Sequence, residues 1–254
     1  MRGAPGKEII RDDTIGLSGD RQKEQGVNFE NEIICGDCLD IMKDWPDGCV
    51  DLVLTDPPYG IGESNQKNMS RTGLARPTNY GNYQWDRQKV SDSHIIECIR
   101  ASRNQIVFGG NYYGSILGDT SCYVIWDKDN GKNDFADCEL AWTSFSSAVR
   151  KLVYRWNGML QEPGLPKESR QHPTQKPLGV MKWILERYSQ PNNLILDPFC
   201  GSGTTCVAAK MLGRRYIGIE ISPEYCQIAR DRLRAVDTGV PVKEARAGQG
   251  ALFK

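Results

Sequence analysis

The tetrapeptide DPPY, residues 56–59, is the stretch of this sequence whose residue types most clearly indicate chemistry. It follows the strand-like run VDLVLT (50–55). Two consecutive prolines fix two backbone φ angles and remove two N–H donors, so the chain leaves the strand in a stiff turn. Rigid turns at strand ends are where α/β proteins place ligands and catalysis. The candidate catalytic residues are therefore Asp56, Pro57, Pro58 and Tyr59.

A second stretch, NLILDPFCGSGTTCVAAKMLG (193–213), has the form of a cofactor-binding turn. An apolar strand ends on Asp197, and a helix rich in small residues follows. Between them, Gly201 and Gly203 would let the backbone approach a ligand, and the helix N-terminus offers free N–H groups. The next strand ends on Glu220, nineteen residues after Gly201, a spacing that suits a carboxylate binding ribose hydroxyls. Either a dinucleotide or another adenosine-bearing cofactor fits this pattern.

Both stretches belong to an alternation of strands and helices. The apolar, β-branched runs that predict strands are NEIIC (31–35), VDLVLT (50–55), NQIVFG (104–109), CYVIWD (122–127), NLILD (193–197) and RYIGIE (215–220). Helical patterns lie at about 90–102, in PLGVMKWILERY, in GTTCVAAKML and in SPEYCQIARDRLRAV, where Ser222 and Pro223 suit the first positions of a helix. This alternation predicts an α/β fold with a mostly parallel sheet and helices on both faces.

The overall composition is that of a soluble globular protein, with 39% hydrophobic and 25% charged residues in 254. No apolar stretch approaches the roughly 20 residues of a membrane span, and the polar N-terminus has no signal-peptide core. We expect a cytoplasmic protein with a single domain over 29–236, a flexible tail at 1–28 and a loose tail at 237–254.

The nine cysteines are irregularly spaced, which argues against a disulfide scaffold. Cys35 and Cys38 form one C-x-x-C, but there is no second, and the only histidines are His94 and His172. Because a structural zinc site needs four ligands, no metal is predicted. The pair also lies at the exit of a strand into a loop, which is not typical of a redox motif.

Basic residues are concentrated in two segments, although 32 basic and 32 acidic side chains balance over the chain. The segments are 61–89, with five basic and two acidic residues, and 147–187, with eight and three. Parts of them, about 61–86 and 150–171, are rich in polar, glycine and proline residues and predict loops. Such segments could follow the phosphates of a nucleic acid, and charge alone leaves an ordinary solvated surface equally open.

Four motifs taken together resemble one family, the amino-methyltransferases of DNA. They are DPPY (56–59), HPTQKP (172–177), DPFCGSGTT (197–205) and GIEIS (218–222). Their order resembles that of the circularly permuted β class, in which the catalytic motif precedes the cofactor motif, and the likeness covers about 31–236. The resemblance implies a Rossmann-like, S-adenosylmethionine-dependent methyltransferase fold with a mostly parallel seven-stranded sheet. Its compact form is similar to phage or orphan modification enzymes.

The resemblance also implies a set of cofactor-binding residues and no metal. Asp37 would read the adenine amine of the cofactor, with Cys38 beside it, and Glu220 would hold the ribose. The methionine end would be shaped by Asp197, Phe199, Gly201, Ser202, Gly203 and Thr204, and bordered by Asp56. The segment that closes the pocket near the methionine carboxylate would contribute His172, Thr174 and Lys176.

The same resemblance gives DPPY a chemical role. The exocyclic amine of adenine is a poor nucleophile because its lone pair is delocalised into the ring. The Asp56 carboxylate and the Pro57 carbonyl could accept its two N–H bonds and favour the cationic transition state. Tyr59 would stack on a base flipped out of the duplex, an interaction of about 1–3 kcal/mol.

The activity implied is therefore methylation of adenine N6 in double-stranded DNA. An aspartate first in the motif usually accompanies adenine, and N4-cytosine remains an alternative. Methylation of RNA or of a protein glutamine, or an inactive nucleic-acid-binding subunit, are further alternatives. Cytosine carbon-5 methylation is excluded because the sequence has no Pro-Cys pair. Arg71 and Arg76 are predicted to contact DNA, and a homodimer or a cognate restriction endonuclease is left open.

Overall fold

The computed structural model describes residues 29–60, 89–131, 136–157, 160–164, 168 and 174–239. Several predictions fall outside these residues: the tail at 1–28, the whole loop at 61–86, part of the loop at 150–171, and the site residues Arg71, Arg76 and His172. Residues 237 and 238, predicted to begin the C-terminal tail, still belong to a helix that ends at Thr238, and residues 240–254 of that tail lie outside the described residues. Within the described residues, no helix is long and apolar enough to cross a bilayer.

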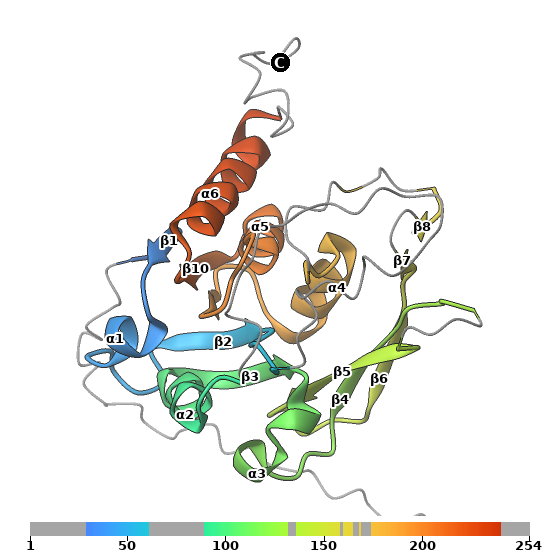
Figure 1. Cartoon of the computed structure of the whole chain (residues 1–254), viewed down its shortest axis with the longest axis horizontal. Coiled ribbons are helices and arrows are strands. Elements are labelled where there is room, and N and C mark those ends of the chain that lie inside the picture. Colours follow the sequence, from blue (N-terminus) through green and yellow to red (C-terminus); the bar gives the residue numbers. More distant parts are fainter. Residues whose placement is uncertain are drawn as a thin grey trace, which may run out of the picture.

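The centre of the fold is an eight-stranded sheet in the order β1-β10-β9-β2-β3-β5-β4-β6 (Figure 1). The neighbours β1 (Glu32–Cys35), β10 (Arg215–Glu220), β9 (Leu194–Asp197), β2 (Val50–Thr55) and β3 (Ser102–Phe108) are all parallel. The next strand, β5 (Cys138–Thr143), is antiparallel to both β3 and β4 (Tyr123–Asp127). The predicted α/β class with a mostly parallel sheet is thus confirmed.

The sheet has one strand more than the seven predicted. The additional edge strand β6 (Arg150–Val153) pairs with β4 in parallel, and its sequence RKLV is half charged because three of its four side chains are exposed. Beyond it, β7 (Trp156–Asn157) and β8 (Leu160–Gln161) form a separate two-stranded pair. All six predicted strand runs are strands, whereas β5 to β8 lie where no apolar run marked them.

Helices cover both faces of the sheet, as predicted (Figure 1). Leu52, Leu54 and Ile195 pack with α4 (Leu178–Tyr188), α5 (Thr204–Met211) and α6 (Pro223–Thr238). The intervening residues Val53 and Leu196 pack on the opposite face with α1 (Cys38–Met42) and α2 (Asp92–Ala101). This alternation follows from the two-residue period of a strand that is buried on both sides.

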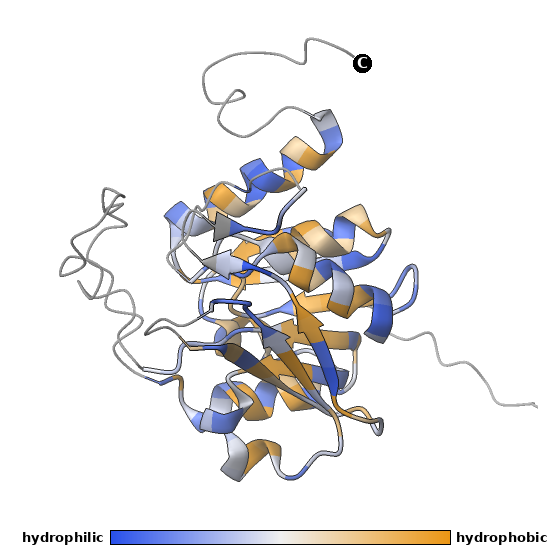
Figure 2. Cartoon of the chain, turned by 90° about the vertical axis from the view of Figure 1, so that its right-hand side faces the viewer, coloured by the Kyte–Doolittle hydropathy of each residue, from blue (hydrophilic) through white to orange (hydrophobic). Residues whose placement is uncertain are grey.

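The remaining helices and their surfaces follow from local sequence. Short helices η2 (Gly110–Tyr112) and α3 (Gly114–Leu117) follow β3; α3 packs beside α2, and η2 packs against β5. Helix α6 begins as predicted, with the Ser222 side chain accepting a hydrogen bond from the Tyr225 N–H. Figure 2 shows hydrophilic and hydrophobic residues alternating along this helix, which leads to the C-terminal end. One face therefore packs on α5 while the other faces solvent.

Gly218 of β10 allows α5 to approach the sheet closely. A Cβ at this position would lie 2.6 Å from Ile33 Cδ1 and 2.8 Å from the Cys206 sulfur. We expect Gly218→Val to lower the free energy of unfolding by about 1–3 kcal/mol through overpacking. The matched control is Gly114→Ala, where nothing lies within 4 Å of the added methyl group. Equal urea midpoints for Gly218→Val and the parent protein would contradict this packing.

Candidate active site at the carboxyl edge of the sheet

Four carboxylates follow one another across adjacent parallel strands. In the order of the strands β1, β10, β9 and β2 they are Asp37, Glu220, Asp197 and Asp56. Cys35 pairs with Glu220, and Gly218 pairs with Asp197, so the strand ends are staggered by about two residues while all four acids lie at the same edge of the sheet. With about 4.8 Å between strands, this acidic row spans about 14 Å. The carboxyl edge of such a sheet is where α/β proteins bind ligands.

Asp56, at the β2 end of the row, is held by two side chains. One carboxylate oxygen accepts a hydrogen bond from the Tyr59 hydroxyl, and the other forms an ion pair with the Lys176 ammonium. The Tyr59 ring stacks on Tyr112, with ring centroids 5.0 Å apart and planes 12° apart. Gly109 makes room for that ring, because a Cβ there would lie 2.2 Å from Tyr59 Cε1.

Hydrogen bonds from two other segments, one before α2 and one after η2, hold Pro58 of the turn. The Pro58 carbonyl accepts hydrogen bonds from the Tyr113 hydroxyl at 2.7 Å and from the Val90 N–H at 3.2 Å. Pro57 is buried. Since β3 and η2 lead directly into Tyr112 and Tyr113, the DPPY turn is braced by the segment that follows β3. The stiffness predicted from two prolines is therefore reinforced by tertiary contacts.

Lys176 connects Asp56 to a second acid, Glu139 of β5. Its buried ammonium lies 3.1 Å from Glu139 Oε2, and Lys128 Nζ lies 2.6 Å from the other oxygen of Glu139. The resemblance implies that Lys176 lies near the methionine carboxylate, which stays a prediction; in the structure its ammonium contacts the catalytic candidate Asp56. The neighbouring Gln175 reaches the glycine turn, defined as residues 201–203, and accepts a hydrogen bond from the Ser202 hydroxyl at 3.3 Å. Thr174, just before it, is half-buried.

Burial and neighbouring charges set the protonation of this network. Burial raises the pKa of Asp56 to about 6; the Lys176 charge opposes this shift, and the Glu139 charge adds to it. Burial disfavours the Lys176 ammonium, but Asp56 and Glu139 outweigh it and raise its pKa. Burial acts against the Glu139 carboxylate too, yet Lys176 and Lys128 hold its pKa below the ordinary value. Lys176 and Glu139 are therefore both charged at neutral pH.

The glycine turn and Glu220, both predicted to bind the cofactor, are hydrogen-bonded to each other. Gly201 and Gly203 have φ angles of 50° and 78°, in the region that favours glycine. The Gly201 N–H donates to Glu220 Oε2 at 2.9 Å, and the Ser222 N–H donates to Oε1 at 2.8 Å. Both carboxylate oxygens retain further lone pairs for a ligand. Glu220 is thus an oriented acceptor beside the turn.

Asp197 is the most buried acid of the row and joins two strands. Its Oδ1 accepts hydrogen bonds from the Thr55 hydroxyl at 2.7 Å and from the Phe199 N–H at 3.2 Å. Burial raises the pKa of Asp197, and these hydrogen bonds oppose the shift. Because Thr55 is the last residue of β2, this contact fixes the start of the DPPY turn relative to the glycine turn.

Arg232 of α6 holds the glycine turn through hydrogen bonds. No sequence pattern identified this residue. Its Nη1 donates to the Ser202 carbonyl at 2.7 Å, to the Ser202 hydroxyl at 3.0 Å and to the Thr204 hydroxyl at 2.9 Å. Burial lowers the pKa of Arg232, and the nearby Glu168 charge opposes this. In the stretch RDRLRAV it resembles its solvated neighbours, so only its place in the fold identifies it.

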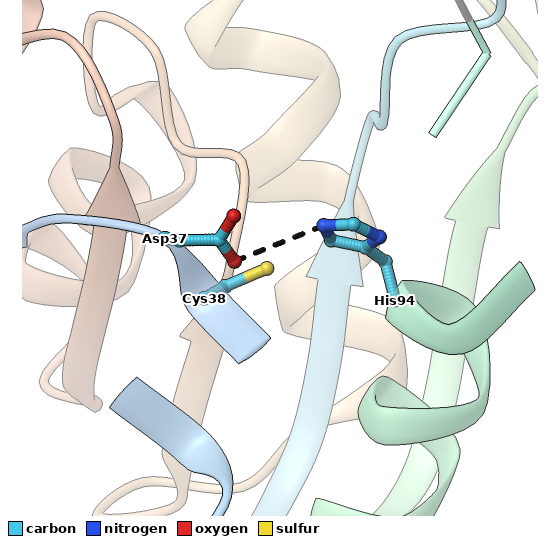
Figure 3. Close-up of side chains that lie close together, drawn as sticks. All are labelled: Asp37, Cys38 and His94. Atoms are coloured by element: carbon cyan, nitrogen blue, oxygen red, sulfur yellow. Dashed lines mark ion pairs between the residues drawn. The ribbon is translucent and has the colours of Figure 1, made fainter. Parts of the chain in front are cut away.

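At the β1 end, Asp37 and Cys38 face His94 of α2 (Figure 3). Asp37 caps α1 by accepting the Leu39 N–H at 2.8 Å, and its Oδ1 lies 3.8 Å from His94 Nε2. The other nitrogen of His94 lies 2.7 Å from the Ser91 hydroxyl, and its ring packs 5.9 Å from Phe199. In the sequence, His94 was considered only as a metal ligand. In the structure its ring lies beside Asp37 and borders the site.

The side chains in Figure 3 are also of types that bind metal ions, and their ligand atoms lie within 4.8 Å of one another. Burial, however, raises the pKa of Cys38 to about 12, so the thiol is protonated at neutral pH. Asp37 already caps a helix. These three residues are better suited to a ligand that donates hydrogen bonds, with Asp37 as the exposed acceptor.

Comparison with known proteins indicates the family that this chain is similar to. A family model described as DNA methylase, of the N6/N4 methyltransferases, matches residues 125–231. Type II methyltransferase M.HinfI of Haemophilus influenzae is 28% identical over 258 residues, covering 84% of this chain and 71% of that protein. Type II methyltransferase M2.MboI of Moraxella bovis is 27% identical over 241 residues, covering 79% and 86%.

Solved structures share the fold. The cytosine-N4-specific PvuII DNA methyltransferase aligns with a TM-score of 0.54 at 17% identity, covering 85% of this chain and 89% of that chain. TTHA0409 of Thermus thermophilus, complexed with S-adenosyl-L-methionine, aligns with a TM-score of 0.50 at 20% identity, covering 81% and 93%. These comparisons thus support the likeness to the N6/N4 DNA amino-methyltransferases, the S-adenosylmethionine-dependent family that the motifs resemble.

The protonation of Asp56 can be tested without substrate. We expect its carboxyl carbon, assigned by its loss in Asp56→Asn, to titrate near pH 6 in a ¹³C NMR experiment. Asp127, whose pKa is lowered by the Asp129 N–H and by Lys151, serves as an internal contrast. Lys176→Met should raise the Asp56 midpoint further, because the ammonium favours the carboxylate. A midpoint below the ordinary 3.8 would contradict this account of the site.

Proposed function

We propose that this protein transfers a methyl group from S-adenosylmethionine to the exocyclic N6 amine of adenine in double-stranded DNA, in the cytoplasm. The observation that carries the proposal is the acidic row: Asp56 of the DPPY turn lies at one end, with the Tyr59 ring beside it. The other three carboxylates lead away from it, past the glycine turn.

The order of the acidic row suits the cofactor. Asp37, at the far end, is only half-buried and would accept the adenine amine. Glu220, on the next strand, would accept the ribose hydroxyls, with its orientation fixed by two backbone N–H groups. The glycine turn and Asp197 then border the methionine end, nearest to Asp56. A ligand laid along the row thus meets acceptors for its donors and reaches the catalytic turn with its methyl group.

The chain itself would activate the amine by position and charge. The bound cofactor supplies an electrophilic methyl group. Asp56 would accept one N–H of the base amine and the Pro57 carbonyl the other, which directs the nitrogen lone pair toward the methyl carbon. As positive charge grows on nitrogen, the carboxylate stabilises it in a largely buried site. Tyr59, already stacked on Tyr112, offers its ring to a base that has left the duplex.

Adenine is proposed as the base because the motif begins with Asp56. N4-cytosine methylation is the second candidate, since the same two acceptors would bind the exocyclic amine of cytosine. An inactive nucleic-acid-binding subunit is disfavoured because both the DPPY and the glycine motifs are complete. DNA would lie along the polar segments at about 61–86 and 150–171; the described part of the latter begins with exposed Arg150 and Lys151 on β6. A homodimer and a cognate endonuclease remain predictions.

The adenine-binding role of Asp37 can be tested by combining a variant of this residue with a cofactor analogue that lacks the adenine amine. Asn can still cap α1, so Asp37→Asn should preserve the fold. Calorimetry should show about 10- to 100-fold weaker binding of S-adenosylhomocysteine, because a hydrogen bond to a charged acceptor is lost. S-inosylhomocysteine, which lacks the amine, should bind both proteins alike. Asp40→Asn, an exposed acid of the same helix, is the control. Equal losses of affinity for the two ligands would contradict a contact between Asp37 and the adenine amine.

The catalytic role of Asp56 can be tested with methyl-labelled cofactor and duplex DNA, followed by base analysis. Asp56→Ala should reduce turnover by at least about 100-fold, while cofactor affinity changes little, because the lost acceptor matters most as the amine becomes cationic. Tyr59→Phe keeps the stacking ring and should retain more activity than Tyr59→Ala. Label on cytosine instead of adenine would move the proposal to its second candidate. Wild-type turnover in a folded Asp56→Ala protein would contradict the mechanism.

A further inference from the structure

Glu139 has no role in the function proposed so far, although it lies one side chain away from Asp56. We propose that Glu139 is a positioning residue for methyl transfer: it holds the Lys176 ammonium and offsets its charge, so that Asp56 can stabilise a cationic amine. This inference rests on the proposed role of Asp56. It adds Glu139 of β5 to a site that otherwise consists of the acidic row, the DPPY turn and the glycine turn.

The contacts of this network come from separate parts of the chain. Asp56 follows β2, Lys176 precedes α4, Glu139 lies on β5, and Lys128 follows β4. Lys176 is 8% exposed and bridges the two acids, contacting Asp56 Oδ2 and Glu139 Oε2. Its ammonium also lies 5.1 Å from the centre of the Phe108 ring. Such a buried cation between two carboxylates has little freedom to move into solvent.

A charge count shows why a second acid is needed. Asp56 and Lys176 alone form a neutral pair, and the ammonium would repel the positive charge that develops on the methylated nitrogen. Glu139 contributes a negative charge on the opposite side of the ammonium, so that these three groups together are negative. Lys128 contacts the far oxygen of Glu139 and is therefore the group of the network most distant from Asp56. The local field at Asp56 thus favours a cation.

The antiparallel direction of β5 explains how Glu139 reaches this edge. Glu139 is the second residue of its strand and pairs with Trp126, the penultimate residue of β4. Because β5 runs against β3 and β4, its beginning lies at the edge where those strands end. The acid therefore joins the carboxyl edge of the sheet from a strand that starts there.

A purely structural role predicts different measurements from a positioning role. If Glu139 only stabilised the fold, Glu139→Gln would lower stability and leave the ionisation of Asp56 unchanged. The titratable groups that face Asp56 are Lys176, Glu139, Asp197, Tyr59 and Tyr113. Of these, the charges of Glu139 and, to a lesser extent, Asp197 raise the pKa of Asp56. Removal of the Glu139 charge should therefore shift the Asp56 titration to lower pH, a readout that packing alone does not move.

The experiment compares Glu139→Gln, Glu139→Asp and Lys128→Met with the wild type in two assays. In methyl transfer to duplex DNA, Glu139→Gln should lower kcat about tenfold or more with little change in KM, and Glu139→Asp should restore part of it. In the ¹³C titration, the Asp56 midpoint should fall in Glu139→Gln. In Lys128→Met it should rise, because the negative charge of Glu139 is then less compensated.

Asp51→Asn is the matched control, since this acid lies at the opposite end of β2 and accepts the Leu194 N–H at 2.8 Å. It should change neither kcat nor the Asp56 midpoint. An unchanged midpoint in both Glu139→Gln and Lys128→Met, or wild-type kcat in Glu139→Gln, would overturn the inference. If the proposed function is wrong, the wild-type protein will transfer no methyl group to DNA. The titrations will still decide whether the charges of Glu139 and Asp56 are coupled, so the two failures are distinguishable.

Discussion

The parallel pairing of β1, β10, β9 and β2 is the constraint on which the candidate site depends. A slip of one residue in any of these strands would turn its side chains to the other face of the sheet and displace its terminal acid. The register is secured at the edge itself: Gly36 N–H donates to the Glu220 carbonyl at 3.0 Å, and Thr55 donates to Asp197. The hydrogen bonds that align the strands thereby also align the carboxylates.

In the DPPY turn, the local sequence fixes the backbone, whereas tertiary contacts fix the position of the Tyr59 ring. Two prolines fix backbone angles locally, but they do not determine where the Tyr59 ring lies. That position depends on Gly109, which leaves space for the ring, and on Tyr112, which stacks on it. Preorganised acceptors and stacking surfaces need little rearrangement when a ligand arrives, which is the physical basis of electrostatic catalysis.

Much of the fold and half of the site could be predicted because their signals are local. Buried parallel strands are continuous apolar runs, and the glycine turn needs residues that adopt positive φ. By contrast, β5 carries the mixed sequence CELAWT, and edge strand β6 is half charged. Arg232 and Glu139 are common surface residue types, and nothing local distinguishes a buried instance from a solvated one. Their roles arise from contacts between distant segments, which no short pattern records.

The buried charges of the site indicate a balance between stability and function. Placing Asp56, Lys176 and Glu139 in the interior removes them from water, and replacement of such networks by apolar side chains often stabilises a protein. A neutral pair would satisfy the requirements of folding at the lowest electrostatic cost. Glu139 instead makes the three groups nearest the reaction negative, while Lys128 balances its charge from the far oxygen. This placement of charge is more readily explained by stabilisation of a cation than by stabilisation of the fold.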